Sequence, residues 1–287
     1  MWRHPRLQLF NAASIISVQN NLAYLKFNRR TVLSQKYATI AVPNDEYMPK
    51  RINFFGYWSE ELSIFLASGI KKNTALLDLG AHCGLVSLQT FNLGLVKKIY
   101  LVEPKADNLS ALRYNLQKID KLCEVLIIDA AITEKGNKTS NLYSERGATM
   151  NSSINPILPG VSFTNKSKIN VEKVKTISAS KLCKNFLKWV GDSDVALKSD
   201  LQGMDVTILS QFSDIFWSKV SIGSIEICSI KYAREKEINL LIIKLKIFKH
   251  IFIDYNLNNQ ITFDTLSEFY LGNSGKVINI YFKRNQN

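Results

Sequence analysis

The sequence of 287 residues predicts an α/β fold, in which a mainly parallel sheet is flanked by helices. From residue 75 onward, strand-like apolar runs alternate with helix-like runs, a pattern typical of parallel strands joined by right-handed crossovers. At residues 75–84 an apolar run ends in Asp78, and two glycines then flank a short turn before a helix-like stretch. A second apolar run ends in Glu103, nineteen residues after Gly84, where a nucleotide-binding α/β fold holds a ribose.

The individual elements follow from hydrophobic period and helix-start residues. Ser59 is a candidate N-cap for a short amphipathic helix, and Asp107 begins another helix well because its side chain can accept hydrogen bonds from first-turn amides. We expect strands over 75–79, 98–103, 124–131, 195–201, 221–228, 250–256 and 276–283, and helices over 60–68, 84–93, 107–119, 179–189, 203–212 and 234–248.

Two segments depart from this alternation. The first has weak periodicity and predicts short strands, a hairpin-like lead-in or a cap, so we expect an N-terminal extension over 1–55 and a main domain over 56–287. The second, over 132–170, is rich in Asn, Ser, Lys, Gly, Thr and Pro. It is either a loop or hairpin excursion that lies over a site or a disordered insert.

The composition is that of a globular protein, with 46% hydrophobic and 21% charged residues. No run reaches the roughly 18 consecutive apolar residues that a membrane span needs. The N-terminal apolar stretch is interrupted by polar residues, which disfavours a signal peptide. The four cysteines form no Cys-x-x-Cys pair, so the sequence predicts neither a zinc site nor a disulfide framework. We expect buried, reduced thiols and a cytoplasmic location.

The net charge of +13 raises the question of a nucleic-acid partner. Lysine outnumbers arginine 28 to 9, and Asn and Ile are abundant, as coding bias toward A and T produces. The charge therefore argues weakly for nucleic acid. Residues 1–51 carry eight Lys or Arg against two acids, a net charge of +6. This arm is either a peripheral contact for an anionic partner or glycolipid surface, or a solvated segment.

The glycine turn carries the first chemical prediction. Gly80, Ala81, His82 and Gly84 form a turn whose backbone can approach a ligand, ahead of a helix whose amides point toward it. Asp78 at the strand tip can neutralise a cation, whereas a dinucleotide pyrophosphate disfavours an extra anion there. The pattern therefore favours S-adenosylmethionine (SAM), which carries a sulfonium and an α-amino group. The alternative is an ordinary strand, turn and helix with glycines that serve packing.

Two further strand ends complete the predicted cofactor site. Glu103 can accept hydrogen bonds from both ribose hydroxyls with its two carboxylate oxygens. Asp129 follows the third apolar strand and can accept a hydrogen bond from an adenine amino group, while Ala130 leaves room for the ring. The alternative for each acid is a surface carboxylate at the end of a strand.

These motifs, in this order, resemble the FkbM-type SAM-dependent methyltransferases. The similarity covers roughly residues 55–230. It implies a Rossmann-like sheet of seven strands with the last antiparallel, SAM as cofactor, and methylation of hydroxyls on sugars, natural products or glycolipids. The resemblance is carried by Gly56-Tyr57-Trp58-Ser59-Glu60, Asp78-Leu79-Gly80-Ala81-His82-Cys83-Gly84, Glu103-Pro104, Asn115, Asp129-Ala130-Ala131, Ser152-Ser153-Ile154, Thr176 to Leu182, and Lys198 to Asp205.

The catalytic half departs from the pattern of the family. Gln202 stands where the family usually has Glu, and Ser178 stands where an Asp is expected. We predict that Asp200, at the carboxyl end of a central strand, is the base or the acid that orients the acceptor. Lys198 lies two residues earlier on the same strand face, where it can pair with Asp200 and keep that acid ionised. The alternative is a structural ion pair at the strand end.

Three function classes follow. The first is a SAM-dependent O-methyltransferase acting on a sugar, glycan, lipid or natural product. The second is a SAM-binding pseudo-enzyme, suggested by Gln202 and Ser178. The third is a nucleic-acid methyltransferase, which the charge permits. The chain lacks the Asn-Pro-Pro-aromatic or Asp-Pro-Pro-aromatic motif that holds a flipped base.

Overall fold

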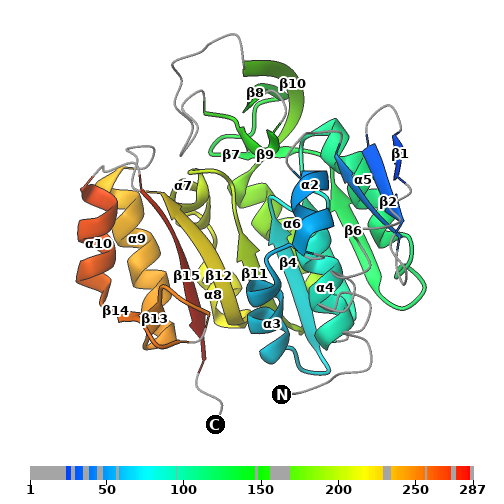
Figure 1. Cartoon of the computed structure of the whole chain (residues 1–287). Helices are drawn as coiled ribbons and strands as arrows, with labels where there is room; N and C mark the ends of the chain where they lie inside the picture. Colours follow the sequence, from blue (N-terminus) through cyan, green and yellow to red (C-terminus); the bar gives the residue numbers. More distant parts are fainter. Residues whose placement is uncertain are drawn as a thin grey trace.

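The computed structural model describes residues 24–26, 30–34, 39–43, 48–55, 58–94, 96–145, 148–155, 169–228, 234–255, 257–272 and 276–284. A large central sheet, a smaller sheet above it and a third sheet near the N-terminus make up the fold (Figure 1). The Gly56-Tyr57 part of the expected approach motif and most of the basic arm lie outside the described residues. None of the helices in these ranges is long and apolar enough to cross a membrane.

The central sheet confirms the expected fold class. It has eight strands in the order β14-β13-β15-β12-β11-β4-β5-β6, and β15 runs antiparallel to its neighbour β12. The eighth strand is β14, which forms a short hairpin with β13 and was not predicted. The bounds are β4 Thr74–Leu79, β5 Lys98–Val102, β6 Glu124–Ile128, β11 Asp194–Ser199, β12 Val220–Cys228, β13 Ile251–Phe252, β14 Gln260–Ile261 and β15 Val277–Lys283.

Helices cover both faces of this sheet. Successive side chains of a strand point to opposite faces, so Leu76 packs into one hydrophobic cluster and Leu77 into the other. Burial on both faces is why the parallel strands read as continuous apolar runs. One layer holds α3 Glu60–Ser68, α4 Leu85–Gly94 and α5 Ala106–Leu116; the other holds α6 Ala179–Val190, α7 Asp205–Leu209, α8 Asp214–Lys219, α9 Glu235–Leu245, the 3-10 turn η3 Lys246–Phe248 and α10 Phe263–Leu271.

Several element predictions were wrong in length or detail. The helix expected over 203–212 is the short α7, and Ser213 starts a separate helix, α8, by accepting a hydrogen bond from the amide of Phe216. The strand expected over 250–256 is only two residues long, because the Asp254 carboxylate accepts from the Asn258 amide and turns the chain back. Ser59 has a positive φ of 49° and makes no side-chain cap.

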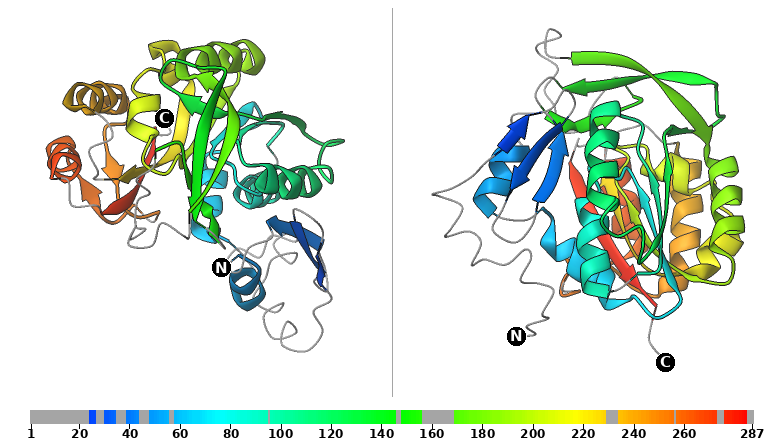
Figure 2. Two further views of the ribbon diagram at one scale, coloured as in Figure 1. Left: turned by 90° about the horizontal axis from the view of Figure 1, so that it is seen from above. Right: turned by 90° about the vertical axis from the view of Figure 1, so that its right-hand side faces the viewer.

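The segment after β6 forms a second sheet. It contains β7 Ala131–Thr133, β8 Thr139–Glu145, β9 Ala148–Ser153 and β10 Ile169–Ser178, in the order β7-β10-β8-β9. Both views place it above the carboxyl ends of the central parallel strands (Figures 1 and 2). The hairpin alternative therefore describes this excursion, while residues 156–168 of it lie outside the described ranges.

The N-terminal segment docks on the main domain. Strands β1 Tyr24–Lys26, β2 Arg30–Ser34 and β3 Thr39–Pro43 form an antiparallel sheet, followed by α2 Met48–Phe55. The amide side chain of Asn115, on α5, accepts from the Ala41 amide at 2.7 Å and donates to the Ala41 and Cys83 carbonyls, both at 2.8 Å. Asn115 thus ties this small sheet to the glycine turn, and the boundary at residue 55 stays a prediction.

Candidate active site

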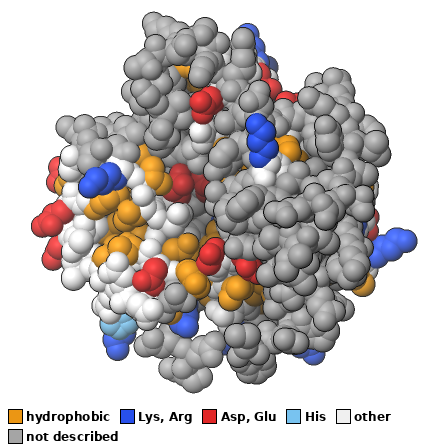
Figure 3. All heavy atoms as spheres, in the orientation of Figure 1, with side chains coloured by type: hydrophobic (Ala, Val, Ile, Leu, Met, Phe, Trp, Pro, Cys, Tyr) orange, Lys and Arg blue, Asp and Glu red, His pale blue; other side chains and the backbone are white. Residues whose placement is uncertain are grey.

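A cavity of about 470 Å³ opens between the carboxyl ends of the central strands and the second sheet. It lies where the strand order reverses between β4 and β11, the position at which open α/β sheets bind ligands. Its volume is within the range of small-molecule sites, roughly 300–1,000 Å³. In Figure 3, acidic side chains lie toward the middle of the face shown. The cavity wall includes His82, Glu103, Asn108, Ala130, Asp200 and Glu226.

The two glycines of the turn serve the packing of the chain itself. Gly80 and Gly84 both have a φ of 74°, a conformation that favours glycine. A Cβ at Gly80 would overlap the backbone oxygen of Asp200, and one at Gly84 would overlap the side chain of Leu112 on α5. Gly84 also lies outside the cavity lining. The packing alternative therefore accounts for both glycines, and Gly80 lets the β11 loop approach the turn.

The turn amides are already bonded within the protein. The amides of Gly80 and Ala81 both donate to the Val102 carbonyl at 3.0 Å, and the His82 amide donates to Oε2 of Glu103 at 2.9 Å. The three turn amides therefore have their partners within the protein, and the expectation that amides of the following helix point toward a ligand stays a prediction. A ligand would lie over a turn whose shape is fixed by the end of β5.

Glu103 is the centre of the side of the cavity where the cofactor is predicted to bind (the cofactor side). Its carboxylate accepts from the amides of His82 and Lys105, both at 2.9 Å, and from Nδ2 of Asn108 at 3.0 Å. A carboxylate has about four lone-pair sites, so one remains free, on Oε2. The contact with two ribose hydroxyls stays a prediction, and the bonds within the chain leave one lone-pair site of Glu103 for it. Burial raises the pKa of Glu103, and the hydrogen bonds from Lys105, Asn108 and His82 oppose that rise.

Asn108 supplies the acceptor that the sequence prediction missed. Its side-chain Oδ1 is buried and has no hydrogen-bond partner among the described residues, although Asn108 lines the cavity. A buried acceptor without a partner costs roughly 1–3 kcal/mol, so a ligand hydroxyl or amine there is favoured. The sequence signal for Asn108 was its position in the first turn of the helix that follows Glu103, since that turn begins at the end of the sheet where the site is predicted.

Asp78 lies beneath the cavity rather than on its wall. It is 1% exposed, and its carboxylate lies 3.0 Å from Nζ of Lys198 and accepts from the Ser87 hydroxyl at 2.6 Å. Lys198 also donates to the Gly80 carbonyl at 2.5 Å. The predicted pair of Lys198 with Asp200 is corrected to a pair with Asp78, because Lys198 and Asp78 are direct partners in the β11–β4 register.

The buried pair leaves no net charge for the ligand. Although burial lowers it, the pKa of Lys198 stays above its ordinary value because Asp78 and Asp200 favour the ammonium. Lys198 therefore remains a cation and cannot serve as a base. The direct neutralisation of a ligand cation that was predicted for Asp78 is not available from this position.

Of the two residues predicted for the site after β6, Ala130 lies on the cavity and Asp129 lies away from it. Ala130 is 6% exposed and lines the cavity. Asp129 is exposed, does not line the cavity, and lies 3.7 Å from the guanidinium of Arg113. The strand ends at Ile128, one residue before the acid, so Asp129 leaves the sheet toward solvent.

The opposite side of the cavity, where the sequence predicts the base for an acceptor (the acceptor side), is built around Asp200, Gln202 and Glu226, which all line the cavity. Gln202 has a positive φ of 50°, and its amide nitrogen donates to Asp200 at 2.8 Å and to Glu226 at 3.4 Å. Strained backbone of this kind is common at functional sites. Glu226 was missed in the sequence; its signal was a single acid within the apolar strand 221–228.

Asp205 supports the turn that carries Gln202. It is 1% exposed and accepts hydrogen bonds from the Ser199 hydroxyl at 2.5 Å and the Leu201 amide at 3.0 Å. Burial raises the pKa of Asp205 to about 7, with Asp200 adding to the rise. Asp205 is therefore a positioning residue that fixes the backbone between the strand end and Gln202.

His82 is neutral in this environment. Burial lowers the pKa of His82 to about 3, and the nearby charges of Lys198 and Lys105 act in the same direction. Its Nε2 lies 3.1 Å from the Thr149 hydroxyl on β9. His82 therefore joins the glycine turn to the second sheet and is not a base at neutral pH.

The second sheet is fixed over the cavity by side chains on both sides. Lys105, after β5, donates to Ser144 at 3.0 Å and pairs with Glu172 at 2.7 Å. On the acceptor side, the Ser153 hydroxyl donates to the Gln202 carbonyl at 3.2 Å. These contacts make residues 149–154 a wall of the cavity. The alternative in which the excursion lies over a site is the one that the described part supports.

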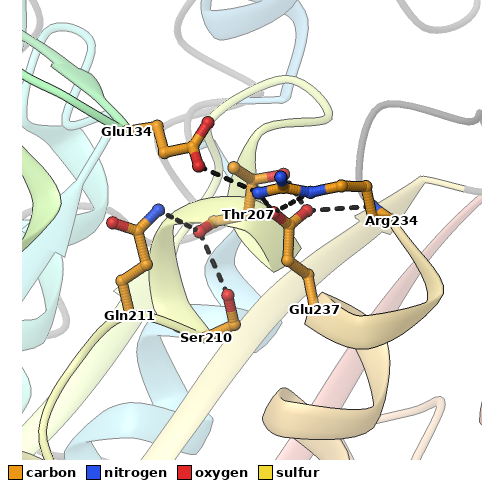
Figure 4. A network of polar contacts seen from close by, with 6 residues as sticks. All are labelled: Glu134, Thr207, Ser210, Gln211, Arg234 and Glu237. Carbon is orange, nitrogen blue, oxygen red and sulfur yellow. Dashed lines mark hydrogen bonds and ion pairs between the residues drawn. The ribbon is translucent and has the colours of Figure 1, made fainter.

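A polar network holds the base of the second sheet to the helical layer. Arg234, before α9, pairs with Glu134, just after β7, at 2.9 Å and also bonds the Glu237 carboxylate (Figure 4). Glu237 in turn accepts from the Thr207 hydroxyl of α7 at 3.1 Å. This network is structural and fixes the segment through which the chain enters the second sheet.

The protein resembles known proteins in structure and not in sequence. No known protein family and no curated protein sequence matches the chain. Among solved structures, similarity extends to an rRNA methylase from Streptococcus thermophilus (11% identity, 78% of this chain and 94% of that one, TM-score 0.40). The chain is also similar to the methyltransferase FkbM from Methylobacillus flagellatus (14% identity, 77% of this chain and 47% of that one, TM-score 0.40). A third similar structure is a SAM-dependent methyltransferase from Agrobacterium tumefaciens (8% identity, 91% of this chain and 72% of that one, TM-score 0.41). Such low values show no family.

Proposed function

We propose that the protein is a SAM-dependent methyltransferase that methylates a hydroxyl on a sugar, glycan, lipid or natural product. One observation carries the proposal. One cavity lies where the strand order reverses between β4 and β11. Glu103, which follows β5, lies on one side of it, and Asp200, which follows β11, lies on the other. A cofactor site and a base are thus brought to the same small space.

The residues on the cofactor side fit a nucleoside with ribose hydroxyls. Asn108 offers a buried oxygen without a partner, and Glu103 retains one lone-pair site beside it. Ala130 leaves space on the neighbouring wall. When bound, SAM supplies a methyl group on a cationic sulfur. The chain itself holds the nucleoside, excludes water with the second sheet, and fixes the acceptor for transfer, since alignment is worth roughly 7–11 kcal/mol.

Asp200 is the proposed base for the acceptor hydroxyl. It is half-buried, lines the cavity and follows directly on the end of β11. Base assistance of this kind contributes roughly 10²–10⁴-fold. Acids on this side repel phosphate groups, which supports a small or glycan-like acceptor over nucleic acid. The pseudo-enzyme reading loses one support, because Ser178 caps α6 by accepting from the Lys181 amide at 3.3 Å.

Calorimetry with SAM and its demethylated product, S-adenosylhomocysteine, tests the proposal. We expect wild type to bind both, and Asn108→Ala to weaken both by about tenfold because the unpartnered oxygen and a bond to Glu103 are lost. Ser110→Ala, elsewhere on α5, is the matched control and should bind like wild type. Absence of SAM binding by wild type would sink the proposal, and labelled-methyl transfer to glycan or lipid fractions separates an enzyme from a SAM-binding module.

A further inference from the structure

Glu226 is an acid that neither the sequence pattern nor the cofactor site explains. It lies on β12 beside the end of β11, since Ser199 and Ile225 are partners in that register. Ser224 and Glu226 alternate on β12, and both line the cavity together with Asn279 and Tyr281 of β15. The cavity floor therefore extends past Asp200 onto two further strands. Glu226 is the acid at the centre of that extension.

Gln202 joins the two carboxyl groups. One amide nitrogen donates to Oδ1 of Asp200 and to Oε1 of Glu226, which brings both acids within reach of a single donor. Negative charges on two neighbouring carboxyl groups disfavour each other, which favours a state in which the two groups carry one proton. A Glu at position 202 would add a third carboxyl group, whereas the Gln202 amide donates to both acids and holds them beside each other.

The groups around Glu226 favour its protonated form. Burial raises the pKa of Glu226 well above its ordinary value, and the negative charges of Asp200 and Asp205 raise it further. Lys198 opposes the rise, but its charge is already paired with Asp78. From the other elements around the cavity, Glu61 of α3 and Tyr281 of β15 also line this space, and neither side chain supplies a positive charge.

We propose that Asp200 and Glu226 act as one proton-sharing pair, held by Gln202, which receives the proton of the acceptor hydroxyl. The inference rests on the proposed function and deepens it. The acceptor oxygen forms its bond to the methyl carbon as the carbon–sulfur bond breaks, and the hydroxyl proton passes to the pair. The acceptor then lies over β12 and β15 with an uncharged, hydroxyl-bearing end, because phosphate or carboxylate groups would be repelled by the acids there.

Proton release on cofactor binding tests the pair without any acceptor. A cation in the cavity favours the ionised pair, so SAM should expel part of a proton, up to about one per site, and the uncharged sulfur of S-adenosylhomocysteine should expel less. Calorimetry near pH 7.5 in phosphate and in Tris buffers measures this release from the dependence of heat on buffer ionisation. The measured quantity is the difference in release between the two ligands.

Variants assign that difference to the pair. In Glu226→Gln we expect the SAM-specific release to disappear while SAM affinity stays within about tenfold of wild type. Glu61→Gln is the matched control, because it removes an acid that lines the same cavity outside the pair, and it should keep the release. Asp200→Asn provides a second variant should Glu226→Gln fail to fold.

The outcomes separate this inference from the proposed function. No SAM binding by wild type overturns the proposed function and, with it, the pair. SAM binding with equal proton release for both ligands, or with the difference retained in Glu226→Gln, overturns the pair alone. A difference that disappears in Glu61→Gln assigns the release to an acid outside the pair and also overturns it.

Discussion

The two sides of the cavity differ in how their carboxyl groups are paired. On the cofactor side, Glu103 accepts three hydrogen bonds from the protein, and its position is fixed before any ligand arrives. On the acceptor side, Asp200 and Glu226 share a single amide donor, and Asp205 is buried close behind them. The hydrogen bonds around Glu103 fix its orientation, whereas on the other side burial raises the pKa of Glu226 and of Asp205. Perturbed acids of this kind are characteristic of sites that move protons.

Lys198 connects the two sides, and its removal has the largest expected effect. In Lys198→Met, Asp78 becomes a buried carboxylate with only Ser87 as partner, which costs roughly 3–5 kcal/mol of unfolding free energy. Urea unfolding measures the loss. The double variant Lys198→Met, Asp78→Asn should recover most of it, because no charge is then left unpaired. A single variant within 1 kcal/mol of wild type (a change too small for a lost buried pair) would contradict the pairing.

The second largest loss of stability is expected at Gly80, where the glycine turn and the loop after β11 lie in close contact. Gly80→Ala should destabilise the fold by about 2–4 kcal/mol, since a positive φ costs roughly 1–2 kcal/mol and the Cβ would also displace the Asp200 carbonyl. Gly191→Ala is the control for the cost of a positive φ alone, because Gly191 has a φ of 61° and no atom lies within 4 Å of an added Cβ. The excess cost at Gly80 over Gly191, measured by urea unfolding, is the cost of separating β11 from the turn. Equal costs would show that the approach is unimportant.

Much of this arrangement could be predicted from the sequence. The alternation of elements gave the sheet, and strand-end position placed Glu103 and Asp200, because carboxyl ends of parallel strands meet at one edge. The partner of Lys198 could not be predicted, since it depends on the register of β11 against β4, which aligns Lys198 with Asp78. Glu226 was missed for the same reason: β12 register brings it beside Asp200.

The sequence left the second sheet open between a hairpin excursion and a disordered insert, and it misplaced Asp129, because local sequence does not encode either position. The second sheet pairs β8 with β10, polar segments separated by residues that show no hydrophobic period. Its position over the cavity depends on long-range contacts such as Lys105 with Glu172. Asp129 was assigned to the site because the strand was expected to run to residue 131, whereas it ends at Ile128.

The cost of acids on the acceptor side is measurable through pH. The pKa of Asp205 is about 7 in the folded protein against 3.8 ordinarily, so its contribution to stability is present below pH 4 and is lost as pH rises through 7. Asp205→Asn keeps the pairing with Leu201 and Ser199 without the charge. Relative to wild type, the variant should gain up to about 4 kcal/mol between pH 4 and pH 8, since each unit of pKa difference is worth about 1.4 kcal/mol. Parallel stability profiles for the two proteins would show that Asp205 ionises freely.

The smallest effect is expected at Asp129, which the sequence placed on the cofactor side and the structure places outside it. Asp129→Asn removes an exposed ion pair with Arg113, and such pairs contribute roughly 0–1 kcal/mol. SAM affinity should change less than twofold, whereas Asn108→Ala on the neighbouring wall weakens it about tenfold. Calorimetry on both variants makes the comparison directly. A tenfold loss in Asp129→Asn would return the acid to the adenine side and would mean that β6 extends past Ile128 when the cofactor is bound.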